Sequence, residues 1–155
     1  MAFELLTGGL KLVICSSAST EKEDDEGPYD ATSNKLWSTL HEIGLTPREL
    51  TPAEWRTLTE FGIGLLVLAE PDPSGEDRGV RFEGGKELRR KVREYQPGML
   101  VFNGKQVAKD YFQMPTVAFG LLPNTIGTTK LFVCPGTSGG ATWDKRWWDV
   151  MAKLA

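Results

Sequence analysis

Four short and almost uninterrupted apolar runs limit the folds that this chain can adopt. They read LKLVIC at 10–15, GIGLLVLA at 62–69, MLVF at 99–102 and LFVC at 131–134. Runs of this length without polar alternation are typical of strands that are buried on both faces of a sheet. Because helical patterns lie between them, the sequence predicts an α/β fold with three α/β/α layers and a mostly parallel central sheet.

The predicted helices are recognised by the signals at their ends. The first starts near Asn34, with Ser33 as its N-cap, and ends at Gly44. Thr51 and Glu54 have the spacing of a capping box, which predicts a second helix up to about residue 60. Further helices are expected after Gly84–Gly85 up to Tyr95, after Gly104 up to Phe112 and from Asp144 onward, with a hairpin or an extended connection over 116–130.

Length and composition favour an ordinary globular protein. A chain of 155 residues with 40% apolar residues is expected to form one domain over 1–155, and we expect a monomer. No apolar run approaches the roughly 20 residues of a membrane helix. The first residues lack the pattern of a signal peptide, so we expect a cytoplasmic protein in which Cys15 and Cys134 are buried thiols. With the single histidine, His41, these cysteines do not form a zinc pattern.

Charge gives no strong indication of a partner. A net charge of −3 does not provide the overall basic surface that is typical of nucleic-acid binding. Positive charge is nevertheless concentrated in GGKELRRKVRE at 84–94, which is either a solvated helical face or a phosphate-contacting one. The acidic run EKEDDE at 21–26 should repel phosphates at close range.

Polar loops follow the predicted strands. They cover 16–33, 70–79 and 135–142. In a parallel sheet, ligands bind beyond the carboxyl ends of the strands, so a site is expected at these loops. The first and the last loop begin with small and hydroxylated residues, which allow the backbone to approach a ligand closely.

Several segments, in this order, are similar to a known enzyme family. They are SNKLW at 33–37, GLTPRELTPAEW at 44–55, GGKELRRKVREYQP at 84–97 and FNGKQ at 102–106. From about Leu10 to Leu154 the chain resembles the mismatch-specific uracil-DNA glycosylases, whose relatives include the eukaryotic thymine-DNA glycosylases. The resemblance implies an α/β/α fold and hydrolysis of the N-glycosidic bond of uracil in DNA without a metal or cofactor. The implied partners are uracil-containing and abasic-site DNA.

The chain departs from the family pattern at motif positions that serve catalysis and recognition. The first family motif is G-I-N-P-G, whose Asn positions the attacking water; the matching stretch here starts at Ser16, and Ala18 stands at the Asn position. The second motif, N-P-S-G-L, matches GTSGG at 136–140, which keeps the Ser-Gly but lacks the Asn and the apolar wedge. A polar recognition residue of the family falls on Leu65. The family's usual catalysis cannot therefore be transferred residue by residue.

We hypothesise that a carboxylate from a neighbouring segment replaces the missing water-positioning Asn. Cleavage builds positive charge on the sugar, and a carboxylate nearby can stabilise it and orient the water. Asp30 is the candidate because it adjoins Tyr29, which stands at the position of the family's base-stacking aromatic residue. Backbone N–H groups from 16–19 are expected to bind the departing base. The predicted catalytic residues are Asp30, Ser17 and Ala18, the substrate-binding residues are Tyr29, Ser16, Ser19, Asn34 and Asn103, and the DNA-binding residues are Gly136, Thr137, Ser138, Gly139 and Gly140.

Other interpretations stay open at this stage. Asp30 is either catalytic, a helix cap or a solvated residue. Asn103 either binds the base edge or is structural. The segment 136–140 either contacts phosphate or is a plain turn. The whole chain is alternatively a binder of damaged or abasic DNA whose chemistry was lost at Ala18, or a hydrolase of free nucleosides.

Overall fold

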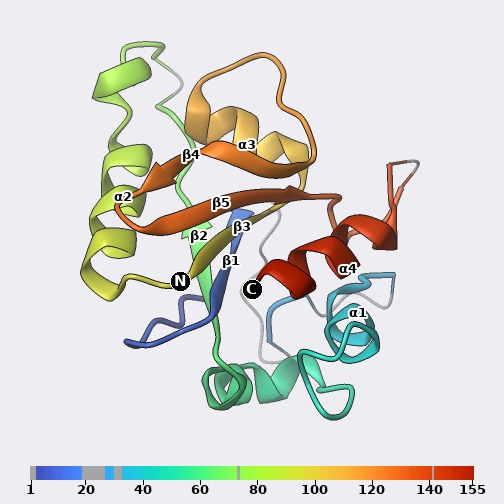
Figure 1. Ribbon diagram of the computed structural model, residues 1–155. Coiled ribbons are helices and arrows are strands. Elements are labelled where there is room, and N and C mark those ends of the chain that lie inside the picture. Colours follow the sequence, from blue (N-terminus) through green and yellow to red (C-terminus); the bar gives the residue numbers. More distant parts are fainter. Residues whose placement is uncertain (1–2, 19–26, 30–32, 73, 141) are drawn as a thin grey trace.

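The computed structural model describes residues 3–18, 27–29, 33–72, 74–140 and 142–155. Its centre is a five-stranded sheet in the order β2-β1-β3-β5-β4 (Figure 1). The strands are β1 (Leu12–Ser17), β2 (Ile63–Leu68), β3 (Met99–Asn103), β4 (Gly120–Ile126) and β5 (Thr129–Cys134). Strands β2, β1, β3 and β5 are parallel, and β4 pairs antiparallel with β5 at one edge. The predicted mostly parallel sheet is confirmed.

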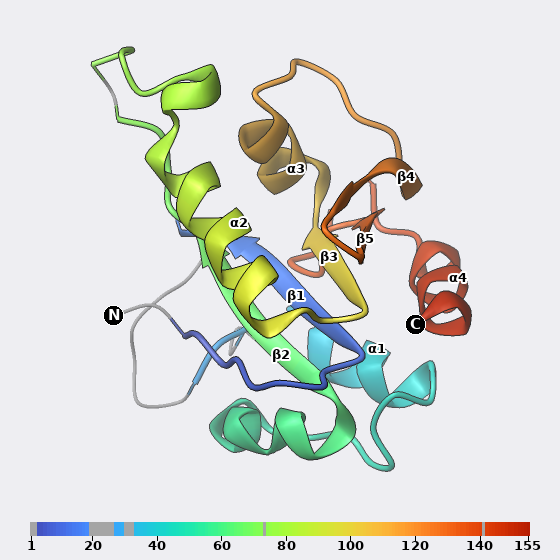
Figure 2. The ribbon, with the colours of Figure 1, turned by 60° about the vertical axis from the view of Figure 1, so that its left-hand side comes forward.

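Helices cover both faces of this sheet, as Figures 1 and 2 show. On one face lie α2 (Glu83–Tyr95) and α3 (Lys105–Phe112); on the other lie α1 (Leu36–Glu42), α4 (Lys145–Leu154) and the 3₁₀ helix η2 (Pro52–Phe61). Val13 and Cys15 of β1 belong to the first core, whereas Leu12 and Ile14 belong to the second. Burial on both faces explains why the strand sequences lack polar alternation.

The register of the strands brings their carboxyl ends to one edge of the sheet. Cys15 of β1 is opposite Phe102 of β3, and Asn103 is opposite Cys134 of β5. The residues that follow β1, β3 and β5 therefore start at about the same level. This edge is the place where the sequence predicts a site.

The ends of some elements differ from the prediction. Lys35, not Ser33, is the N-cap of α1, and the Asn34 side-chain oxygen accepts a hydrogen bond from the Leu36 amide at 2.9 Å. Helix α2 begins at Glu83, before the two glycines rather than after them. A Cβ at Gly84 would lie 2.4 Å from the carbonyl oxygen of Ala69, so this glycine lets the first turn of α2 pack on the end of β2.

The basic helix α2 pairs much of its charge with nearby carboxylates. Lys86 contacts Glu83, Arg90 contacts Glu87 and Lys91 contacts Glu4. These ion pairs are typical of a solvated helical face. Within the described part of the chain, no helix is both long and apolar enough to cross a membrane.

Candidate active site

A small cavity of about 60 Å³ lies at the carboxyl edge of the sheet. It is lined by Ser16, Tyr29, Asn34, Asn103, Gly136, Thr137 and Ser138. Each of these residues was predicted from the sequence to belong to the site. The fold thus brings together the end of β1, the segment before α1, the end of β3 and the loop after β5.

Among the described residues, four that were predicted for the site do not line this cavity: Ser17, Ala18, Gly139 and Gly140. Ser17 is the buried last residue of β1, and Ala18 follows it and is exposed. Gly139 and Gly140 lie farther along the loop after β5, where a Cβ at Gly139 would lie 3.8 Å from the Ser33 carbonyl oxygen. Asp30 and Ser19 lie outside the described residues, so their proposed roles stay predictions.

Tyr29 forms one wall and is held in an unusual backbone conformation. Its φ of 56° is in the left-handed region, which costs a bulky side chain roughly 1–2 kcal/mol. The Trp37 indole N–H donates to the carbonyl oxygen of the preceding residue, Pro28, at 3.3 Å. The half-buried Tyr29 side chain also packs against the core beside α1 and η2. The wall is therefore positioned by contacts from α1 rather than by local preference.

The opposite wall rests on a pair of hydrogen bonds between β3 and the loop after β5. The Thr137 amide donates to Asn103 Oδ1 at 2.9 Å, and Asn103 Nδ2 donates to Thr137 Oγ1 at 3.0 Å. The Lys35 amide, just before α1, donates to the Thr137 carbonyl oxygen at 2.7 Å. Thr137 is only 1% exposed, so these bonds are shielded from water.

The loops after β3 and β5 meet at Gly104 and Gly136. Gly104 has a φ of 110°, and a Cβ there would lie 3.5 Å from the Gly136 Cα. The Gly104 amide also donates to the Cys134 carbonyl oxygen at 2.9 Å. Sequence reasoning did not assign Gly104 or the Lys35 amide to the site. The only available signal was the glycine directly after Asn103.

Asn34 has a fixed orientation beside the cavity. Because its Oδ1 accepts from the Leu36 backbone N–H, the oxygen and nitrogen of the side-chain amide are assigned without ambiguity. No described residue hydrogen-bonds to its Nδ2. Asn34 thus lines the cavity with an amide group whose donors are available to a ligand.

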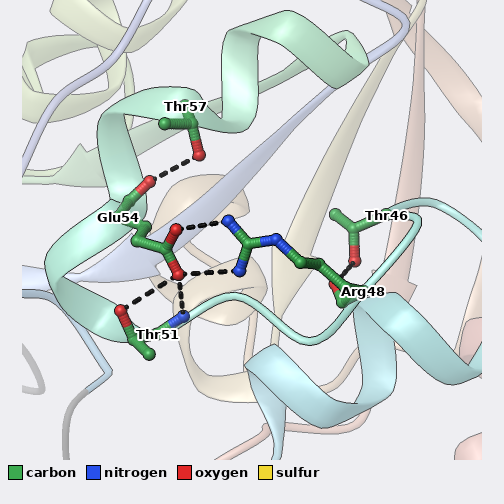
Figure 3. Close-up of polar contacts among 5 residues, drawn as sticks. All are labelled: Thr46, Arg48, Thr51, Glu54 and Thr57. Atoms are coloured by element: carbon green, nitrogen blue, oxygen red, sulfur yellow. Dashed lines mark hydrogen bonds and ion pairs between the residues drawn. The ribbon is translucent and has the colours of Figure 1, made fainter.

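A polar cluster lies at the start of η2 (Figure 3). The Arg48 guanidinium makes two hydrogen bonds to the Glu54 carboxylate, and the Thr51 amide donates to the same carboxylate at 3.0 Å. The predicted capping box is confirmed. Hydrogen bonds from Arg48 and then from Thr51 lower the pKa of Glu54 to about 2. The cluster fixes the first turn of η2, on which Gly27 packs.

The sequence also matches a known family. The model of the Uracil DNA glycosylase superfamily matches residues 3–152. The chain belongs to this superfamily. Membership supports a glycosylase that acts on DNA. The matched region includes all seven residues that line the small cavity.

For a member of the uracil DNA glycosylase superfamily, the types of side chain in the cavity bear on how water is activated. Among the described residues that line it, none carries a carboxylate, a basic side chain or a histidine. Water activation by a charged base would therefore need a group from outside this set.

A larger hollow of about 710 Å³ lies between the loop after β2 and α3. Its lining includes two basic residues, Arg78 and Lys109, and two acidic ones, Asp72 and Asp110. None of the residues that were predicted to bind substrate or DNA or to catalyse the reaction lines this hollow. The smaller cavity is the candidate active site because the predicted motif segments converge there.

Proposed function

We propose that this protein is a uracil-DNA glycosylase of the mismatch-specific type with an altered active site. It would hydrolyse the N-glycosidic bond of uracil in DNA, release uracil and leave an abasic site. The observation that carries this proposal is the convergence of Ser16, Tyr29, Asn34 and the Gly136–Ser138 segment on one cavity within a superfamily match.

The base is recognised by stacking and by hydrogen bonds. The Tyr29 ring stacks on the extruded base, as aromatic side chains do with flipped or single-stranded bases. The Asn34 amide donates to the O4 carbonyl oxygen of uracil, since its own oxygen is engaged by Leu36. A donor at this position favours uracil over cytosine, which carries an amino group where uracil carries a carbonyl.

Asp30 supplies the charge that the described lining residues lack. The water oxygen bonds to C1′ while the bond from C1′ to the base nitrogen breaks and the base leaves as an anion. The Asp30 carboxylate stabilises the sugar cation and takes the proton of the water. Its position next to Tyr29 in the sequence supports this role.

A second candidate function follows from Ala18. This residue matches the position at which the mismatch-specific glycosylases have their water-positioning Asn, and an alanine side chain cannot position water. If no other group replaces the Asn, the protein would bind abasic or damaged DNA without cleaving it.

Uracil release from oligonucleotides separates these functions. The wild type should release uracil from DNA, and Asp30→Asn and Asp30→Ala should lower the rate by about 100-fold or more. Glu60→Gln, an exposed change on η2, controls for the loss of one negative charge. No release combined with a gel shift of abasic DNA would support the binder, and equal activity on free deoxyuridine would support a nucleoside hydrolase.

A further inference from the structure

We propose that Asn103 is a positioning residue: it acts through Thr137 to place the 136–140 loop on DNA and does not contact the base. The proposal rests on the function proposed above, in which that loop contacts the DNA backbone. It assigns to Asn103 a role different from the base-binding one expected from the sequence.

The hydrogen bonds of Asn103 are directed at one residue. Its Oδ1 accepts from the Thr137 amide at 2.9 Å and its Nδ2 donates to Thr137 Oγ1 at 3.0 Å. The Thr137 backbone N–H can only donate, so it fixes which side-chain atom is oxygen, and a flipped amide would lose this bond. An amide held in this way has little freedom to turn toward a ligand.

Thr137 transmits this constraint to the loop. All its polar groups are engaged, because its carbonyl oxygen accepts from the Lys35 amide at 2.7 Å. The next residue, Ser138, is exposed and lines the cavity. Gly139 and Gly140 follow with φ values of 93° and 114°, and glycines have no side chain that could anchor the backbone. The position of Ser138 relative to the cavity is therefore set by Thr137.

Hydrogen exchange of the free protein tests the contact without requiring activity. Asn103→Ala should accelerate exchange of the Thr137 amide by about tenfold or more, because the amide loses its acceptor. Asn103→Asp should keep the protection, because a carboxylate can accept from both the amide and the hydroxyl of Thr137. Unchanged exchange in Asn103→Ala would overturn the proposal, whether or not the protein releases uracil.

DNA binding and catalysis then separate positioning from base contact. Asn103→Ala and Thr137→Val should each weaken binding to an abasic-site duplex by about five- to tenfold, and the double variant should be no weaker than the weaker single one. With saturating enzyme, Asn103→Ala should lower the single-turnover rate of uracil release by no more than about threefold. A rate loss of about 100-fold in Asn103→Ala, with Thr137→Val much less affected, would show that Asn103 contacts the base and would overturn the proposal. If the wild type releases no uracil, the proposed function fails, whereas the exchange and binding measurements still decide the role of Asn103.

Discussion

Gly27 lies against the carbonyl oxygen of Pro52 so closely that a Cβ at Gly27 would be 2.2 Å from that oxygen. The segment that carries Tyr29 therefore rests directly on the first turn of η2. The φ of Gly27, 101°, is also one that residues with a side chain rarely adopt.

Gly27→Ala is therefore expected to destabilise the protein by at least about 2 kcal/mol, from backbone strain and from the clash. Urea unfolding measures the change. Gly8→Ala is the matched control, because a Cβ at Gly8 has no atom within 4 Å and should alter stability by less than about 0.5 kcal/mol. Equal stability of the two variants would mean that the segment does not pack on η2.

Glu54 should make the stability of the protein depend on acid pH. Its pKa is lowered to about 2 in the folded protein, mainly by the hydrogen bonds from Arg48, compared with an ordinary value of 4.5. The stabilisation is complete above the unfolded-state pKa near 4.5 and is lost as pH falls toward 2. The urea midpoint of the wild type should therefore fall more between pH 6 and pH 2.5 than that of Glu54→Gln.

Glu49→Gln provides the control for this pH dependence. Glu49 is an exposed carboxylate near the same cluster and makes no ion pair among the described residues. Its variant should follow the wild-type pH profile. If Glu54→Gln also follows that profile, the interaction with Arg48 contributes nothing to stability.

Local signals predicted much of the fold. The apolar runs identified β1, β2, β3 and β5, because strands buried on both faces need apolar residues at every position. The capping box of Thr51 and Glu54 was predicted down to its hydrogen bonds, since all its atoms lie within four residues. The N-cap of α1 is Lys35, two residues after the predicted Ser33, and Asn34 instead hydrogen-bonds the Leu36 amide at the start of the helix.

Long-range geometry could not be predicted in this way. Asn103 and Thr137 are 34 residues apart, and their hydrogen bonds depend on the register of β3 with β5. The left-handed conformation of Tyr29 also has no local signal, because an aromatic residue disfavours it. The sequence therefore predicted seven residues that line the small cavity, but not which of them bind each other.

The two cysteines should be unreactive in the folded protein. The thiols of Cys15 and Cys134 are fully buried, and burial raises the pKa of the Cys134 thiol well above its usual range. A thiol reagent at pH 8 should therefore modify neither residue within minutes, and both after unfolding in urea. Glu60→Cys adds an exposed thiol and should react at once. Rapid modification of the folded wild type would show that one of the cysteines is accessible.

Variants of Asn34 should separate its hydrogen bond to the start of α1 from its proposed hydrogen bond to the base. Asn34→Asp keeps an oxygen acceptor for the Leu36 amide, whereas Asn34→Ala removes it and should cost about 1 kcal/mol of stability. For uracil release the order of the two variants should reverse, with Asn34→Ala the more active. Asn34→Ala loses one donor to the base, about a tenfold effect, but Asn34→Asp places a carboxylate against a uracil carbonyl and should be less active still.

Unfolding in urea and single-turnover uracil release, measured on the same two variants, check this reversal. If Asn34→Asp were both the more stable and the more active variant, Asn34 would serve only to hydrogen-bond the start of α1, and the donor to the base would have to come from elsewhere.

Tyr29 should contribute to the binding of uracil-containing DNA through its aromatic ring. Stacking of a base on an aromatic side chain is worth roughly 1–3 kcal/mol, so Tyr29→Ala should weaken binding of uracil-containing DNA by about ten- to hundredfold. Tyr29→Phe keeps the ring and should cost less. Binding is best measured with Asp30→Asn as the background, so that the uracil is not removed during titration. Because the ring would contact only the extruded base, neither Tyr29 variant should change the affinity for an abasic-site duplex. A similar loss on abasic and uracil-containing DNA would mean that Tyr29 shapes the loop and does not stack on the base.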